Sequence, residues 1–121
     1  MRIFIADDSA KIRQQLSARL AELEGIQVVG GAPNGVSAVE QISALKPDVV
    51  ILDYQMPGYT GLEVLKKIKQ VVPPPLAILL TNYVELRATC LAAGADYFFD
   101  KTCEINELIE LIARLGKEHN R

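Results

Sequence analysis

Residues 3–9 read Ile-Phe-Ile-Ala-Asp-Asp-Ser (IFIADDS), an apolar run that ends in two adjacent carboxylates. A run of apolar and small side chains without polar alternation is typical of a strand that is buried on both faces of a parallel sheet. Asp7 and Asp8 then place two like charges side by side, and like charges at close range repel each other. Their position directly after a strand therefore needs a chemical reason.

Four further runs suit the same kind of strand, at residues 28–30 (VVG), 49–52 (VVIL), 76–80 (LAILL) and 97–99 (YFF). Between the runs, apolar residues recur at spacings of three and four, which is the pattern of an amphipathic helix. A less amphipathic helix is expected from about Val84 to Ala93. The clearer helical stripes are Ile12, Leu16, Leu20 and Leu23, then Val39, Ile42 and Leu45, then Leu62, Leu65, Ile68 and Val72, then Ile105, Leu108, Ile109, Ile112 and Leu115.

Local signals mark several ends of these elements. Ser9 is a candidate N-terminal cap, Pro47 would stop the second helix, and Gly94 would end the fourth. Residues 73–75 are three prolines, which predict an extended connector into the fourth strand. Strict alternation of strand and helix, with right-handed crossovers, predicts an α/β fold whose strands are all parallel. The carboxyl ends of such strands share one edge of the sheet, where ligands bind.

The composition is that of one globular domain spanning residues 1–121, with 50% apolar and 23% charged residues. A net charge of −2 gives no general attraction to nucleic acid or anionic lipid, and the basic cluster at residues 66–69 is expected to be a solvated helix face. Strand-like sequence from Arg2 leaves no room for a signal peptide, and the apolar runs are too short to cross a membrane, so a cytoplasmic location is expected. Cys90 and Cys103 form no CxxC motif and are expected to be reduced thiols.

Polar residues follow the apolar runs where the strands should end. Asp7 and Asp8 follow the first run, Asp53 the third and Thr81 the fourth, and Lys101 lies just beyond the fifth. Each one alone has an ordinary explanation as a helix cap, a turn residue or a surface residue. Together they should converge at one edge of the sheet, where three crowded carboxylates raise one another's pKa unless a cation neutralises them. The paired acids therefore predict a cation site.

The chemistry of this expected site favours a phosphoryl group. Carboxylate oxygens without Cys or His neighbours favour a hard cation, and Mg²⁺ suits a few carboxylates completed by waters and a phosphate oxygen. Lys101 would add a second positive charge and Thr81 a hydroxyl donor, both of which stabilise a phosphoryl group during transfer. Asp53 is the candidate nucleophile that forms an acyl phosphate, because it stands alone after the central strand while Asp7 and Asp8 hold the metal.

These residues resemble a known family, the receiver domain of two-component response regulators. The resemblance covers nearly the whole chain and depends on four spaced motifs: ADDS at 6–9, ILDYQMPGYTG at 51–61, LLT at 79–81 and GADYFFDK at 94–101. It implies a flavodoxin-like, doubly wound five-stranded sheet of order 2-1-3-4-5. It also implies Mg²⁺-dependent phosphoryl transfer from a phosphohistidine, on a sensor histidine kinase or a His-containing phosphotransfer protein, followed by hydrolysis.

The resemblance further implies a switch that changes a partner-binding face for a downstream protein or an output domain, with a phosphorylation-dependent dimer as one form of output. Beyond phosphotransfer to itself and self-dephosphorylation, no enzymatic activity is expected. The site residues that it implies are the phosphoacceptor Asp53, the metal ligands Asp7, Asp8, Asp53 and the Gln55 backbone carbonyl, the phosphoryl-contacting Thr81 and Lys101, and the switch residues Thr81 and Phe98.

Several positions depart from the commoner family pattern. Thr102 follows Lys101 where the family usually has a proline after a cis peptide bond, and a cis bond before a non-proline residue costs about 3–4 kcal/mol. Phe98 stands where the family often has a tyrosine that turns inward on activation, so it lacks a hydroxyl. Gln55 and Tyr83 occupy positions at which the family tunes access of the attacking water.

Three other classes of protein share part of this pattern. A flavodoxin-like flavin protein should have a Ser-, Thr- and Gly-rich loop after the first strand, where this chain has two carboxylates. A Mg²⁺-dependent phosphatase with an Asp nucleophile should have a second Asp where Gln55 stands. An inert receiver-like interaction module would not need the complete acid, hydroxyl and lysine set. The lone His119 lies in a polar tail, so the chain is expected to accept a phosphoryl group rather than to donate one.

Overall fold

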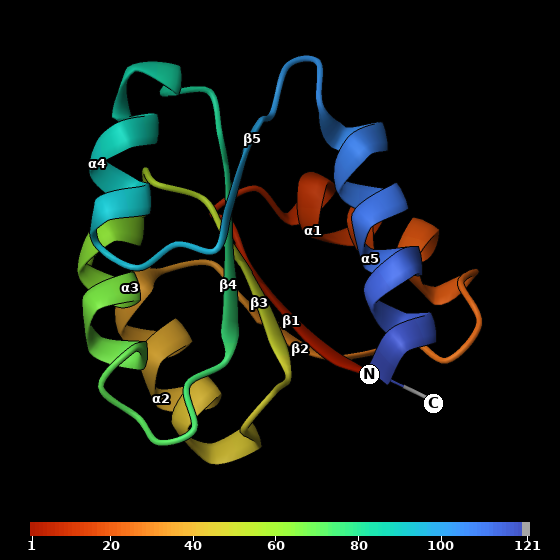
Figure 1. The fold of residues 1–121 in the computed structure, drawn as a ribbon. Coiled ribbons are helices and arrows are strands. Elements are labelled where there is room, and N and C mark those ends of the chain that lie inside the picture. Colours follow the sequence, from red (N-terminus) through yellow and green to blue (C-terminus); the bar gives the residue numbers. More distant parts are fainter. Residues whose placement is uncertain (120–121) are drawn as a thin grey trace.

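A parallel five-stranded sheet lies between two layers of helices in the computed structural model, which describes residues 1–119 (Figure 1). The strand order is β2-β1-β3-β4-β5, and all four neighbouring pairs are parallel. The predicted doubly wound α/β fold and its order 2-1-3-4-5 are therefore confirmed. The elements are β1 (Arg2–Ala6), α1 (Ala10–Ala21), β2 (Gln27–Ala32), α2 (Gly35–Leu45), β3 (Val49–Leu52), α3 (Gly61–Ile68), β4 (Leu76–Thr81), the 3₁₀ helix η1 (Val84–Leu86), α4 (Arg87–Ala92), β5 (Tyr97–Asp100) and α5 (Ile105–His119).

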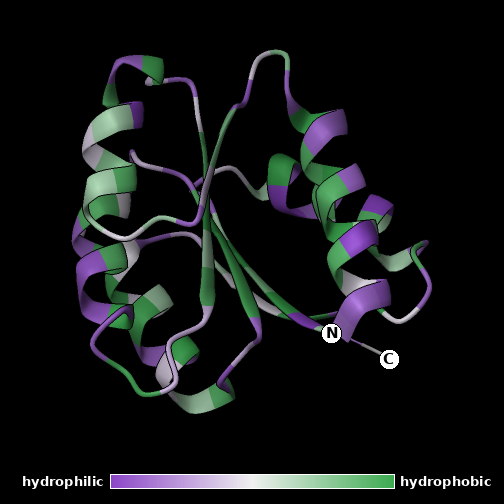
Figure 2. Ribbon diagram, in the orientation of Figure 1, coloured by the Kyte–Doolittle hydropathy of each residue, from purple (hydrophilic) through white to green (hydrophobic). Residues whose placement is uncertain are grey.

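Each face of the sheet is covered by its own layer and its own apolar core. Helices α1 and α5 lie on one side, and α2, α3 and α4 lie on the other (Figure 1). Alternate residues of β1 enter opposite cores, Ile3 and Ile5 on the α1–α5 side and Phe4 and Ala6 on the other side. Figure 2 shows the strands as mostly hydrophobic and the helices as mixed, which is the pattern expected of a sheet that is buried on both faces.

Most helix ends agree with the local signals in the sequence. The Ser9 hydroxyl accepts a hydrogen bond from the Ile12 N–H at 3.3 Å, which confirms the predicted cap. The extension of the third helix to Val72 was wrong, because α3 ends at Ile68 and the Val72 side chain is 91% exposed. Pro73 accounts for Val72 itself, since the residue before a proline is disfavoured in the helical region.

The fourth helix is shorter and less regular than the sequence predicts. Residues 84–93 form the 3₁₀ turn η1 followed by the six-residue helix α4, and Cys90 is the buried residue of α4. Gly94 follows with a φ of +113°, a backbone conformation that side-chain-bearing residues rarely adopt, so its role as the stop is confirmed. Within residues 1–119, no helix is both long and apolar enough to span a membrane.

The sheet register brings the carboxyl ends of β1 and β3 level with each other, and β4 and β5 end together two residues further along. Ala6 of β1 pairs with Leu52 of β3, which in turn pairs with Leu79 of β4. The backbone bonding continues one residue past two strands, because the Asp53 N–H donates to the Ala6 carbonyl at 2.9 Å and the Lys101 N–H donates to the Thr81 carbonyl at 3.0 Å. The residues that follow the strands are thus held by main-chain hydrogen bonds at one edge of the sheet.

Candidate phosphoacceptor and cation site

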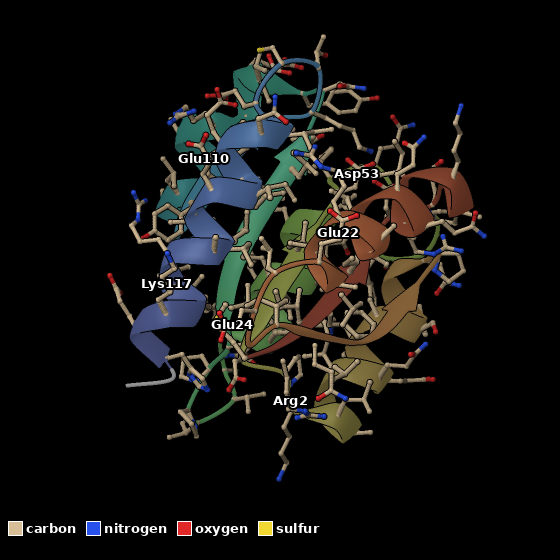
Figure 3. The ribbon with its side chains drawn as sticks, turned by 90° about the vertical axis from the view of Figure 1, so that its right-hand side faces the viewer. Arg2, Glu22, Glu24, Asp53, Glu110 and Lys117 are labelled. Atoms are coloured by element: carbon tan, nitrogen blue, oxygen red, sulfur yellow. The ribbon has the colours of Figure 1, made fainter. Side chains whose placement is uncertain are left out.

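Three carboxylates meet at the carboxyl edge of the sheet. Asp7, Asp8 and Asp53 each contribute an oxygen, and these oxygens lie within 4.8 Å of one another. Asp7 and Asp53 are 2% and 8% exposed, whereas Asp8 is exposed. In Figure 3, Asp53 lies at the upper edge of the sheet, and Arg2 marks the opposite edge. The predicted convergence of the three acids is confirmed by this geometry.

Lys101 bridges the two buried carboxylates. Its Nζ lies 2.5 Å from Asp7 Oδ2 and 2.9 Å from Asp53 Oδ2. Burial acts to lower the pKa of Lys101, but the hydrogen bonds to Asp53 and Asp7 and the charges of both carboxylates outweigh it, so that the pKa of Lys101 is raised. One ammonium group leaves two of the three carboxylate charges unbalanced. The donor set is all oxygen, with no His or Cys, so it could hold a hard divalent cation.

Thr81 lies beside this cluster, at the end of β4, and is fully buried. Its hydroxyl oxygen accepts a hydrogen bond from the Tyr83 N–H at 3.3 Å, while its carbonyl accepts from the Lys101 N–H. The bond from Tyr83 uses the hydroxyl oxygen of Thr81 as an acceptor and leaves its proton unused by that bond. The backbone bond to Lys101 also ties the Thr81 position to that of the bridging lysine.

A small cavity opens over the acids. It has a volume of about 280 Å³ and is lined by Asp8, Asp53, Gln55, Asn82, Tyr83 and Lys101. This volume is below the usual size of a drug-sized ligand site, but it accommodates a phosphoryl group with a few waters, each of which takes about 30 Å³. The cavity is thus matched in size to a small group that binds over the carboxylates.

Two side chains from different loops meet at the rim of this cavity. The Tyr83 hydroxyl donates a hydrogen bond to Gln55 Oε1, and the Tyr83 ring packs edge-on against Tyr54 with 5.6 Å between ring centroids. The sequence placed Gln55 and Tyr83 near the site but could not show their contact, because the contact depends on how two loops approach each other. The Gln55 side chain is thereby occupied as a hydrogen-bond acceptor.

The loop after β5 contains the peptide bond that joins Lys101 to Thr102. In residues 1–119, the only cis peptide bond is Val72–Pro73, so the Lys101–Thr102 bond is trans. Thr102 is held by two hydrogen bonds, from its N–H to Asp100 Oδ1 at 2.8 Å and from its hydroxyl to Asn82 Oδ1 at 3.1 Å. Lys101 thus reaches the acids without the cis bond that the commoner family pattern uses.

Phe98 already lies inside the core. Its side chain is 4% exposed and packs in the apolar core on the α2–α3–α4 side, and the Arg87 guanidinium lies 5.7 Å from its ring centroid. In this conformation Phe98 fills core volume, and its role as a switch residue stays a prediction.

A doubly wound α/β sheet with lysine-bridged carboxylates at its carboxyl edge, where ligands of such sheets bind, defines the class of domain to which the chain belongs. Residues 3–113 match the response regulator receiver domain family, and the chain belongs to this family. It is therefore a receiver domain of two-component response regulators, as the sequence resemblance implied.

Individual relatives agree with this assignment. A protein-glutamate methylesterase/protein-glutamine glutaminase of Carboxydothermus hydrogenoformans is 40% identical over 89% of this chain and 33% of its own length. The response regulator GacA of Pseudomonas viridiflava is 32% identical over 93% of this chain and 53% of its length. The response regulator domain of Thermotoga maritima CheB superposes with a TM-score of 0.88 at 31% identity, covering 97% of this chain and 96% of that one. The chain thus spans between a third and about half of the length of these two curated relatives.

Proposed function

We propose that Asp53 accepts a phosphoryl group from the phosphohistidine of a sensor histidine kinase or a His-containing phosphotransfer protein. The observation that carries this proposal is the placement of Asp53. Its carboxylate lines the small cavity, and one of its oxygens is held 2.9 Å from the Lys101 ammonium. A nucleophile that is fixed beside a cation and borders a phosphoryl-sized space supports this role.

The proposed transfer breaks one bond and forms one. A carboxylate oxygen of Asp53 attacks phosphorus while the P–N bond to imidazole breaks, and the electron pair of that bond stays on the imidazole nitrogen. The ring leaves neutral when its other nitrogen carries a proton. Lys101 and the Thr81 hydroxyl donate hydrogen bonds to phosphoryl oxygens as negative charge redistributes over them. In the later hydrolysis, water attacks the same phosphorus while the bond between phosphorus and the Asp53 oxygen breaks. The water protons leave with inorganic phosphate, and the Asp53 carboxylate is restored.

We propose Mg²⁺ as the cation of this site. Asp8 and Asp53 would bind it directly, Asp7 directly or through water, and the Gln55 backbone carbonyl would be a further ligand. When bound, Mg²⁺ supplies positive charge that stabilises the phosphoryl oxygens. A phosphatase mechanism needs a general acid in addition, and Gln55, which accepts a hydrogen bond from Tyr83, carries no acidic proton.

The proposed output is a change in the partner-binding face formed by η1, α4, β5 and α5, with Thr81 and Phe98 as switch residues. The upstream partner is the phosphohistidine protein, and the downstream partner is a separate protein, an output domain or a second receiver domain. The proposed location is the cytoplasm. We propose that the domain performs no catalysis other than its own phosphorylation and dephosphorylation.

Intact-mass measurement tests the covalent step. The protein is incubated with Mg²⁺ and a small acyl phosphate or phosphoramidate, and a mass gain of one phosphoryl group is expected. Asp53→Asn should abolish this gain, whereas the control Asp48→Asn, at the opposite edge of the sheet, should retain it. A full mass gain in Asp53→Asn would show that Asp53 is not the phosphoacceptor.

A further inference from the structure

Arg13 reaches back from the first turns of α1 to the acidic turn. Its Nη1 donates a hydrogen bond to the Asp7 backbone carbonyl at 2.6 Å, and the side chain is partly buried. This carbonyl lies between Ala6, the last residue of β1, and Ser9, the N-terminal cap of α1. In the described part of the chain, no N–H group of the sheet or of α1 donates to the Asp7 carbonyl, and the Arg13 guanidinium donates to it instead.

Asp7 makes three further contacts besides the one to Arg13. Its N–H donates to the Ala32 carbonyl at 3.1 Å, its Oδ1 accepts from the Ser9 N–H at 2.9 Å, and its Oδ2 contacts Lys101. Arg13 completes this set by fixing the carbonyl that leads into Asp8. The Arg13 contact is thus made to the peptide that joins Asp7 to Asp8.

The edge strand β2 leaves space for the Arg13 side chain. A Cβ atom at Gly31 would lie 3.4 Å from Arg13 Cδ and 3.0 Å from the Ile5 carbonyl oxygen, which is tight. The stem of Arg13 thus runs closely over a residue that has no side chain. Arg13 and Gly31 also line the same groove between α1 and β2. Two elements of the fold therefore determine the path of Arg13 to Asp7.

The two basic residues near the acids act on different atoms. Lys101 contacts carboxylate oxygens of Asp7 and Asp53, which are atoms that a cation would use, whereas Arg13 contacts a backbone carbonyl. A guanidinium offers a rigid, planar set of hydrogen-bond donors. It can thus hold the acidic turn without competing for the carboxylate oxygens.

We propose that Arg13 is a positioning residue for the cation site, which orients Asp7 and Asp8 towards Asp53 through the Asp7 carbonyl. This inference rests on the proposed Mg²⁺-dependent function. A hydrogen-bonding partner behind a metal ligand typically contributes tenfold or more to metal affinity. Arg13→Ala should therefore weaken Mg²⁺ binding by about tenfold, and Arg13→Lys, which keeps the charge and one donor, should recover much of the loss.

Arg19 provides a matched control on the same helix. Its Nη2 donates to Asn106 Oδ1 at 2.8 Å, so Arg19→Ala removes the same charge and also one hydrogen bond, but away from the acids. Mg²⁺ is titrated into each variant by calorimetry at a temperature well below unfolding. Equal Mg²⁺ affinity in Arg13→Ala and Arg19→Ala would overturn the proposal.

A second measurement needs no metal. Amide hydrogen exchange of Ser9, whose N–H donates to Asp7 Oδ1, is followed in the metal-free protein. Faster exchange in Arg13→Ala than in Arg19→Ala is expected, and equal exchange rates would contradict the positioning role. If the wild-type protein binds no Mg²⁺, the proposed function is wrong, and the Ser9 exchange rates still decide whether Arg13 orients the acidic turn.

Discussion

Replacing Lys101 by methionine removes the cation that holds Asp7 and Asp53 together. The side chains are 12% exposed for Lys101, 3% for Asp7 and 9% for Asp53, so this is a buried ionic cluster. Removing one partner of a buried ion pair typically costs about 3–5 kcal/mol, because the remaining charges stay desolvated and unpaired. We expect Lys101→Met to lose about 3 kcal/mol of unfolding free energy in metal-free buffer, since methionine keeps most of the packing.

Mg²⁺ should reverse part of this loss. A ligand that binds only the folded state at 100 times its dissociation constant stabilises that state by about 2.7 kcal/mol. With its carboxylates unpaired, Lys101→Met should gain more from Mg²⁺ than the wild type does. Urea unfolding in EDTA and in Mg²⁺ measures both free energies.

Lys69→Met is the matched control for this experiment. Lys69 pairs with Asp96 at 2.7 Å, but these side chains are 20% and 38% exposed, and such pairs contribute at most about 1 kcal/mol. A loss in Lys101→Met no larger than that in Lys69→Met would refute the argument that burial makes the Lys101 cluster stabilising. An equal Mg²⁺ response in Lys101→Met and wild type would refute the competition between Lys101 and the cation.

The pH dependence of the Lys101 contribution follows from its raised pKa. A group whose pKa is higher in the folded state stabilises that state fully below its unfolded value, here the ordinary 10.5, and loses this contribution as the pH rises through the folded pKa. The difference in unfolding free energy between the wild type and Lys101→Met should therefore hold up to about pH 10 and shrink above that. A difference that disappears below pH 9 would contradict this assignment.

Three further outcomes are expected. Asp8→Asn should abolish measurable Mg²⁺ binding by calorimetry, because it removes an exposed carboxylate of the cation cluster, and unchanged binding would remove Asp8 from the ligand set. Tyr83→Phe should raise two rates about two- to fivefold, phosphorylation by a small donor and dephosphorylation, since the loss of a hydrogen bond of about 0.5–1 kcal/mol frees the rim of the cavity. Tyr97→Phe is the control, because Tyr97 and Tyr83 are both 37% exposed, and it should change neither rate. NMR spectra before and after phosphorylation should show shifts along η1 and α4 and at Phe98, and shifts confined to the loops around the acids would exclude a switch through this face.

Periodicity and strand composition determined the fold class of this chain. The uninterrupted apolar runs indicated strands buried on both faces, and the alternation with helical stripes left a parallel sheet as the solution. The strand order came from the resemblance to the receiver family. Helix ends were predictable where a local contact sets them, as at Ser9 and Gly94. At Val72 the apolar spacing continues past the end of the helix, because spacing alone does not carry the restriction that Pro73 places on the residue before it.

For the site, the sequence by itself determined which chemical groups reach one edge of the sheet, because parallel strands carry the residues that follow them to the same side. Only the tertiary structure decided how these groups pair. The bridge from Lys101 to Asp7 and Asp53, and the Tyr83–Gln55 contact, join residues from separate loops whose approach no local pattern encodes. The Arg13 contact is partly predictable from the sequence. Side chains in the first turns of a helix point back towards its N-terminus, so a basic residue six positions after Asp7 is a usable signal. Its acceptor, however, depends on the space that Gly31 leaves in the edge strand, which only the tertiary structure shows.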